Sequence, residues 1–495
     1  MQREMIVMLE SVETPDSNNS PFFAFETAPL VERVTECGGV IRRGFRGLSA
    51  RKSSNHLANS SPLAEEGDIS SAHDLSRFFR VEADDAELDK LAEEFLKTSG
   101  VAAAYIQPRT GLPLVDLQSI NKMRPSPTPP PQTTPDLSAR QIYLNAAPDG
   151  IDAHYAWSLN GGKGEGVQII DIEWAWNTTH ENLIHHEIPI YGGAPRYISE
   201  DEGFIGRNHG TAVFGVTSAR HGESGIKGIC PNAYVQAITH YGGLGSGEVI
   251  ALAARWLKPG DIIMLEMHRP GPRCGYKECD DQLGYIPIEW WPYDLAAIKE
   301  AVARGVVVIE AAGNGSENLD DARYDKRPRG FPLEWQNPFR RNPVDSGAIL
   351  VGAGAPPPGT HDCDHGPARS RLDFSNFGSM IDAQGWGAEV TTCGYGDYQG
   401  GDEQEDVWYT DRFSGTSSAT PIVAGAIACV QGVRKANNLL PCTPAQLRSL
   451  LQQDTGSPQQ DGPTDYDGSI INPQTERIGQ LPNLRSLIEK ALSLP

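Results

Sequence analysis

The sequence predicts an α/β protein with a doubly wound parallel sheet, preceded by a small α+β unit of βαββαβ type. Over residues 138–495, short apolar runs alternate with helical patterns, which is typical of βαβ units. Four polar residues that suit catalysis lie at the ends of these runs or at the starts of helices: Asp171, His209, Asn314 and Ser417. Folds of this class hold their chemistry at such positions.

The larger unit is expected to begin near residue 138 and to contain a regular series of elements. Its expected strands are 168–171, 233–239, 261–265, 306–309 and 348–352, and its expected helices are 211–218, 248–256 and 293–304. The apolar stretch after Ser417 predicts one further, buried helix. A serine at a helix N-terminus faces unpaired backbone N–H groups, a setting that suits a nucleophile whose reaction develops an oxyanion.

The N-terminal part is divided into a tail over residues 1–20, the βαββαβ unit over 21–107 and a linker over 108–137. In the unit we expect strands at 22–25, 40–48, 77–81 and 101–106, helices at 29–37 and 84–97, and a loop over 50–73. Six prolines between residues 124 and 136 make the linker extended and accessible to proteases.

The order Asp, His, Asn, Ser and the motifs around these residues resemble the subtilisin-like serine proteases. The motifs are His209-Gly210-Thr211, Ala311-Ala312-Gly313-Asn314 and Gly415-Thr416-Ser417, within a resemblance over roughly residues 140–490. The resemblance implies that Ser417 is the nucleophile, His209 its base, Asp171 the acid that orients His209, and Asn314 an oxyanion donor. It also implies peptide or protein substrates, and an inhibitory propeptide in the N-terminal unit, for which an unrelated small α/β domain is the alternative.

Two departures from the family pattern bear on function. The family aspartate is usually followed by a small residue and glycine, whereas this chain reads Asp171-Ile172-Glu173. The strand that ends near Leu265 continues into Glu266 rather than the family's Ser-Leu-Gly segment. We expect Ala311, Ala312 and Gly313 to contact substrate. We therefore also expect Glu266 to contact substrate, with a preference for basic side chains.

Glu173, Glu266 and Glu310 each follow or end an apolar strand, and we expect all three to converge beneath the cleft. Carboxylates held close together cannot all stay ionised, so at least one pKa should rise. The alternative is that each glutamate has a separate partner.

Two other functions stay open. A peptide-binding pseudoprotease would retain the fold without cutting, although all four expected residue types are present. A sedolisin-type enzyme would share the Gly-Thr-Ser motif, but it uses a glutamate where this chain has His209.

Composition excludes some partners. With 42 basic and 64 acidic side chains the net charge is −22, which argues against nucleic acid and anionic membranes. No metal or organic cofactor is required by the expected chemistry, and structural calcium is an unmapped possibility that the family suggests.

Seven of the eight cysteines lie in residues 138–495, where Cys274 and Cys279 are close enough for a local disulfide; free thiols are the alternative. The first ten residues lack the pattern of a secretory signal, whereas the resembled family is often secreted, so localisation stays open.

Overall fold

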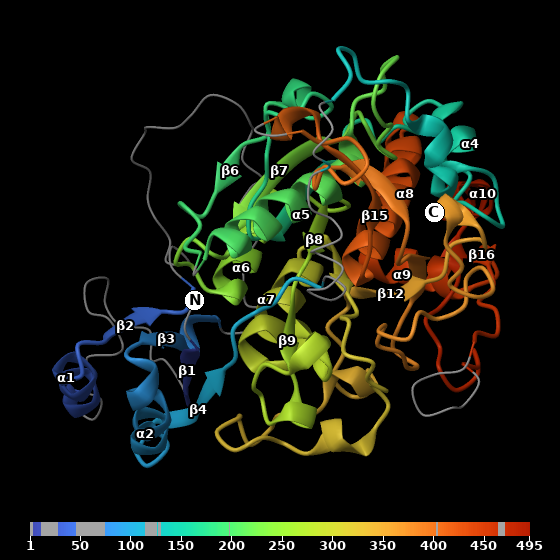
Figure 1. Cartoon of the computed structure of the whole chain (residues 1–495). Coiled ribbons are helices and arrows are strands. Elements are labelled where there is room, and N and C mark those ends of the chain that lie inside the picture. Colours follow the sequence, from blue (N-terminus) through green and yellow to red (C-terminus); the bar gives the residue numbers. More distant parts are fainter. Residues whose placement is uncertain are drawn as a thin grey trace.

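The computed structural model describes residues 3–10, 28–45, 75–113, 126, 130–197, 199–401, 404–463 and 471–495. It contains a small N-terminal α+β unit that packs against a larger α/β unit (Figure 1). The larger unit holds every residue for which we expect a catalytic role.

A seven-stranded sheet forms the centre of the larger unit, in the order β13-β12-β11-β8-β5-β7-β6. All of its strand pairs are parallel, so the predicted doubly wound parallel sheet is confirmed. The strands are β5 (Gln168–Glu173), β6 (Ile190–Tyr191), β7 (Tyr234–Thr239), β8 (Ile262–Leu265), β11 (Val307–Ala311), β12 (Ile349–Gly354) and β13 (Ala383–Trp386).

Helices cover both faces of this sheet, because successive residues of its strands point to opposite sides. In β11, Val307 and Ile309 belong to the core that includes helices α5 (Glu200–Ser218) and α8 (Thr416–Ala436). Val308 belongs to the opposite core, which includes α6 (Ser246–Trp256) and α7 (Pro292–Ala303).

Helix α5 begins well before the expected residue 211, with Ser199 as its N-cap. The sequence masks this start because glycines, which disfavour helices, recur between residues 203 and 210. They are there for close packing: a Cβ atom on Gly210 would lie 2.3 Å from the carbonyl oxygen of Ala175. The first half of α5 therefore packs tightly against the chain that leaves β5.

The other elements of the larger unit lie around the sheet. They are α4 (Ala153–Trp157), α9 (Pro444–Gln452) and α10 (Leu484–Ser493), and the antiparallel pairs of β9 (His268–Pro270) with β10 (Tyr285–Pro287), β14 (Val390–Cys393) with β15 (Tyr409–Phe413), and β16 (Gly456–Ser457) with β17 (Leu481–Pro482). Helix α8 is long and apolar enough to cross a membrane by composition, but its apolar window is wholly buried inside the protein, as in a core helix.

Among the described residues, the N-terminal unit is an antiparallel sheet in the order β2-β3-β1-β4 with two α-helices. Its elements are β1 (Glu4–Leu9), α1 (Ala28–Glu36), β2 (Val40–Arg43), β3 (Phe78–Glu82), α2 (Asp85–Phe95) and β4 (Val101–Gln107). The first strand thus lies within residues 1–20, where we expected a tail. The strand expected at 22–25 and the loop expected at 50–73 lie outside the described residues.

Strand β1 escaped prediction because both of its faces are buried. Met5, Val7 and Leu9 pack with the helices of the unit, while Ile6 and Met8 join the core of the larger unit. A strand covered on both sides reads as a continuous apolar run without alternation.

The two units share a buried polar interface as well as an apolar one. The hydroxyl of Tyr105, in β4, accepts a hydrogen bond from the backbone N–H of Tyr293 at 3.0 Å. The Tyr293 hydroxyl donates to the carbonyl oxygen of Gly44 at 2.6 Å. Buried Arg80 donates to the carbonyl oxygen of Gly243 at 2.7 Å. The N-terminal sheet is therefore fixed to α6, α7 and the loops before them.

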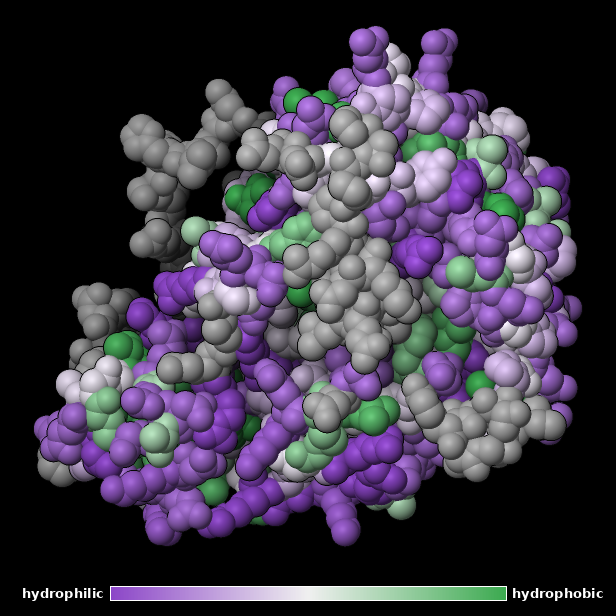
Figure 2. All heavy atoms as spheres, in the orientation of Figure 1, coloured by the Kyte–Doolittle hydropathy of each residue, from purple (hydrophilic) through white to green (hydrophobic). Residues whose placement is uncertain are grey.

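On the face shown in Figure 2, hydrophilic residues dominate the described surface and apolar residues are scattered in small groups.

Candidate active site

Ser417 lies in the first turn of α8, directly after Gly415 and Thr416. Gly415 has φ +104°, which disfavours other residues, and a Cβ atom there would lie 2.1 Å from the carbonyl oxygen of Pro113. Glycine at this position therefore lets another backbone segment approach the serine closely.

That segment is the chain that follows β4, which runs from the N-terminal unit into the larger unit (Figure 1). Ser417 Oγ donates a hydrogen bond to the carbonyl oxygen of Pro113 at 2.9 Å. Gly111 pairs with His268 of β9 in antiparallel fashion, through N–H to O distances of 2.9 and 3.2 Å. Residues 111–113 of the expected linker are therefore held as an extended strand across Ser417.

His209 lies in α5 and contacts Glu173, not Asp171. Its Nδ1 hydrogen-bonds to Oε1 of Glu173, and both side chains are fully buried. The carboxylate of Asp171 instead accepts a hydrogen bond from Nε1 of Trp176 at 2.7 Å. The expected contact between Asp171 and His209 is thus replaced by one from Glu173.

Strand geometry accounts for this exchange. Asp171 and Glu173 are two residues apart in β5 and so point to the same face, the one covered by α5 and α8. Glu173 is nearer the carboxyl end of the strand and reaches His209 from there. The Asp-x-Glu spacing was the signal in the sequence, since it places two acids on one face where the family pattern has one.

Glu266 joins these two acids beneath the nucleophile. Its side chain is fully buried, and its carboxylate has no hydrogen-bond partner among the described residues. Burial raises its pKa well above the ordinary value, the charge of Asp171 raises it further, and adjacent Ser417 partly offsets this. The expected contact between Glu266 and a charged substrate stays a prediction, because Ser417 and His209 are equally buried while residues 111–113 cover the site.

The other groups of the site are also desolvated. Burial raises the pKa of Asp171 to about 7. Burial raises the pKa of Glu173 strongly, and the charges of Asp171 and Glu266 add to the effect. Burial, with a contribution from His268, lowers the pKa of His209. Both shifts disfavour a charged Glu173–His209 pair while residues 111–113 cover the site.

Glu310 does not belong to this group, although we expected it there. It occupies an alternate position of β11 from Val307 and Ile309, and so points to the opposite face of the sheet. Its Oε1 accepts a hydrogen bond from the backbone N–H of Glu289 at 3.2 Å, and burial followed by the charge of Glu289 raises its pKa. The convergence therefore holds for Glu173 and Glu266, with Asp171 as the third acid.

Asn314 is fixed by the residue that precedes the serine. Its Oδ1 accepts hydrogen bonds from the backbone N–H and the hydroxyl of Thr416, at 3.0 and 2.9 Å. Its Nδ2 donates to Oε1 of Gln282 at 3.4 Å, and the Cβ position of Gly415, which adjoins the Pro113 oxygen, lies 3.2 Å from Nδ2. Gly313 N–H donates to the Thr416 hydroxyl at 3.1 Å, and the carbonyl oxygen of Ala312 accepts from Asn376. The Ala311–Gly313 segment is thus anchored to α8, and its contact with substrate stays a prediction.

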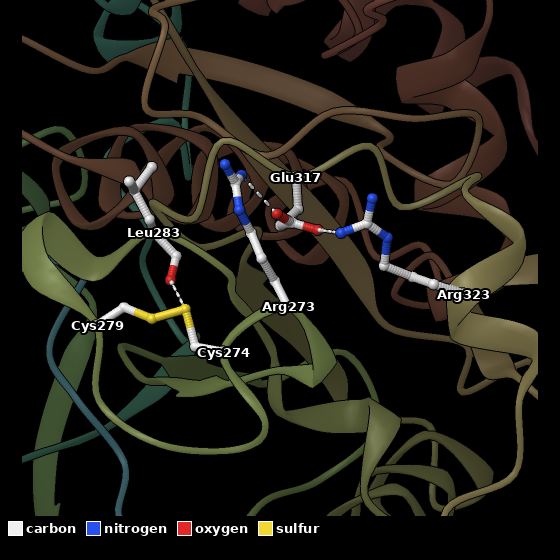
Figure 3. Close-up of a disulfide and its surroundings, with 6 residues drawn as sticks. All are labelled: Arg273, Cys274, Cys279, Leu283, Glu317 and Arg323. Carbon is white, nitrogen blue, oxygen red and sulfur yellow. Dashed lines mark hydrogen bonds and ion pairs between the residues drawn. A yellow bond between two sulfur atoms is a disulfide. The ribbon is translucent and has the colours of Figure 1, made fainter.

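A disulfide closes the loop between β9 and β10, and this loop also contacts the segment that covers Ser417. Cys274 and Cys279 are bonded in the turn between β9 and β10, near the ion pairs that Arg273 and Arg323 make with Glu317 (Figure 3). In the same loop, Gln282 Nε2 donates to the carbonyl oxygen of Leu112 at 2.8 Å. Sequence reasoning missed Gln282 and His268, because their roles come from contacts with residues 111–112 and not from a local motif.

Comparison with known proteins identifies the family. The model of the Subtilase family matches residues 199–470, which include His209, Asn314 and Ser417 but not β5. The chain belongs to the subtilase family. The match begins after Asp171 and Glu173, in line with the departure from the family pattern at β5.

Individual relatives of this subtilase are distant. It is 28% identical over 276 residues to alkaline elastase YaB of Bacillus sp. (strain YaB), covering 55% of this chain and 56% of the relative. It is 26% identical over 276 residues to subtilisin DY of Bacillus licheniformis, covering 54% of this chain and 78% of that protein. Fervidolysin from Fervidobacterium pennivorans, described as a keratinolytic enzyme related to subtilisin, shares the fold at a TM-score of 0.52 and 17% identity, covering 99% of this chain and 61% of that one.

Proposed function

We propose that this subtilase is a serine endopeptidase in which Ser417 is the nucleophile and His209 its base. One observation carries the proposal: the Ser417 hydroxyl faces the carbonyl of an extended peptide segment that is paired along β9. This is the geometry in which an endopeptidase holds a substrate. Protein or peptide substrates fit it, and we assign no role to nucleic acid or membrane.

In the proposed mechanism, His209 Nε2 takes the proton of Ser417 Oγ as the serine attacks the peptide carbonyl. His209 then gives the proton to the leaving amine. Nε2 has no hydrogen-bond partner among the described residues, so it is free for this exchange. Glu173 holds Nδ1 protonated and stabilises the imidazolium. Asn314 Nδ2 and the backbone N–H of Ser417 bind the oxyanion.

Glu266 and Asp171 act behind these groups. Both are fully buried on the same side of the sheet as Glu173, and each carboxyl influences the pKa of another. We assign them a positioning role, in which the protonation of their carboxyl groups influences the pKa of the neighbouring acids. The preference for basic substrate side chains stays a prediction.

A fluorophosphonate probe tests the proposal against the pseudoprotease alternative, because it reacts only with an activated serine. We expect stoichiometric labelling at Ser417 in protein from which the N-terminal unit has been removed. Mass spectrometry of the labelled peptide identifies the site. Heat-denatured protein is the control and should stay unlabelled. Folded, processed protein that binds peptides but takes up no label would favour the pseudoprotease.

We further propose that the N-terminal unit inhibits the enzyme until the chain is cut after Pro113. The support is the hydrogen bond of Ser417 to the Pro113 carbonyl, together with the buried interface made by Tyr105 and Arg80. The Ser417 proton is directed toward the inhibitory segment in this state, away from His209. The cut would fall at the start of the proposed linker, before its proline-rich part.

If this holds, active enzyme should begin at Leu114 or after further trimming, and added residues 1–113 should inhibit it. Gly111→Pro in that segment should weaken inhibition at least about tenfold, because proline removes the N–H that donates to His268. Glu32→Gln, on the exposed side of α1, is the matched control and should inhibit normally. N-terminal sequencing and inhibition constants measure both effects. Full activity of the uncut chain would contradict the proposal.

A further inference from the structure

A second group of chemically reactive side chains lies in the larger unit, outside the residues that surround Ser417. Cys363 and His365 belong to the loop between β12 and β13, and Glu389 lies between β13 and β14. One potential ligand atom of each, the Cys363 sulfur, an imidazole nitrogen of His365 and a carboxylate oxygen of Glu389, lies within 4.8 Å of the other two. His365 Nε2 is 3.1 Å from Glu389 Oε1. Two segments separated in the sequence thus bring sulfur, nitrogen and oxygen donors to one point.

The carboxylate of Glu389 is buried and only partly satisfied. The residue is 8% exposed, and its Oε2 has no hydrogen-bond partner among the residues that the structure describes. His361 Nδ1 lies 3.8 Å from this oxygen, beyond hydrogen-bond distance. A buried carboxylate oxygen without a partner is costly, so the site as it stands lacks one interaction.

Hydrogen bonding alone accounts for part of the arrangement. The contact with His365 Nε2 satisfies Oε1 of Glu389. A network of this kind leaves Oε2 without a hydrogen-bond partner among the described residues.

We propose that Cys363, His365 and Glu389 bind a divalent transition-metal ion, for which zinc best matches the donors. Sulfur, imidazole and carboxylate together are the ligands of Zn²⁺, whereas Ca²⁺ and Mg²⁺ select oxygen alone. Three protein ligands leave a fourth position for water. Cys363 is a free, partly exposed cysteine, so a cation can reach it.

The bound ion would tie the loop after β12 to the segment before β14. Strand β14 pairs with β15, and β15 ends two residues before Gly415. The site therefore supports the strand pair that leads into the nucleophile turn, without touching substrate. Its role is structural, and loss of metal should first appear as lost stability.

Zinc binding can be measured on the full chain carrying Ser417→Ala, which prevents self-digestion. After removal of metal with a chelator under reducing conditions, we expect one equivalent of Zn²⁺ to bind per chain. Co²⁺ in its place should give a thiolate-to-cobalt charge-transfer band. Cys363→Ser should abolish the band and weaken zinc binding at least about tenfold, since even loss of an outer-shell partner costs about 10–100-fold.

Cys37→Ser is the matched control. Cys37 is also a free, partly exposed thiol beside a carboxylate, with its sulfur 3.5 Å from Glu87 Oε2, but it does not belong to the three-ligand group. The Cys37→Ser variant should bind zinc normally. Zinc should raise the melting temperature of Cys37→Ser but not that of Cys363→Ser. If Cys363→Ser does not fold, His365→Asn at its partly exposed position serves in its place. Substoichiometric binding, or an unchanged cobalt band in the folded variant, would overturn the proposal.

Discussion

Replacing Ser417 by alanine should lower kcat for peptide hydrolysis by a factor on the order of 10⁶. That is the magnitude known for the subtilisin nucleophile, and it is this large because the serine, the base and the acid act as one unit. The Ser417 hydroxyl donates to the carbonyl oxygen of Pro113, and loss of this small side chain should leave the fold intact. Hydrolysis of a fluorogenic peptide, with circular dichroism to verify folding, measures the effect.

The same variant reports on processing. Because the cut after Pro113 would use Ser417 itself, the purified Ser417→Ala chain should keep its N-terminal unit. Ser418→Ala is the neighbouring control: the Ser418 hydroxyl donates to the carbonyl oxygens of Trp386 and Gly415, and its loss should leave processing intact. Activity of Ser417→Ala near that of the unmodified chain would rule out the assigned nucleophile.

Replacing Glu173 by glutamine should lower kcat by about 10⁴, as loss of the triad carboxylate does in other serine proteases. Glutamine retains the size of the side chain but removes the charge that stabilises protonated His209. Asp171→Asn should cost far less, because Asp171 contacts Trp176 and not His209. Steady-state kinetics on both variants decide which acid belongs to the triad. A greater loss with Asp171→Asn would return the role to Asp171.

Asp171→Asn should also change the pH dependence. Burial is the main cause of the raised pKa of Glu173, and the charge of Asp171 adds to it, so removal of that charge should lower the pKa. Glu173 must be ionised to support His209, so the acidic limb of kcat/KM should move to lower pH in the variant. Gln168→Asn, at the start of the same strand, is a control that should leave the profile in place.

The sequence predicted most of the elements from local signals. Strands β5, β7, β8, β11 and β12 were found from apolar runs, and α6 and α7 from helical spacing. Boundaries failed where burial changed the pattern. Strand β1 is covered on both faces, and the start of α5 is rich in glycine for the sake of packing.

By itself, the sequence determined the fold class, the family motifs and the residue types needed for peptide hydrolysis, because these depend on short stretches with fixed spacing. Which acid meets His209 was decided only by the tertiary structure. Asp171 and Glu173 share one face of β5, and only the position of α5 selects between them. The placement of Pro113 against Ser417 was likewise decided in three dimensions, since it joins residues 304 positions apart that no local pattern connects.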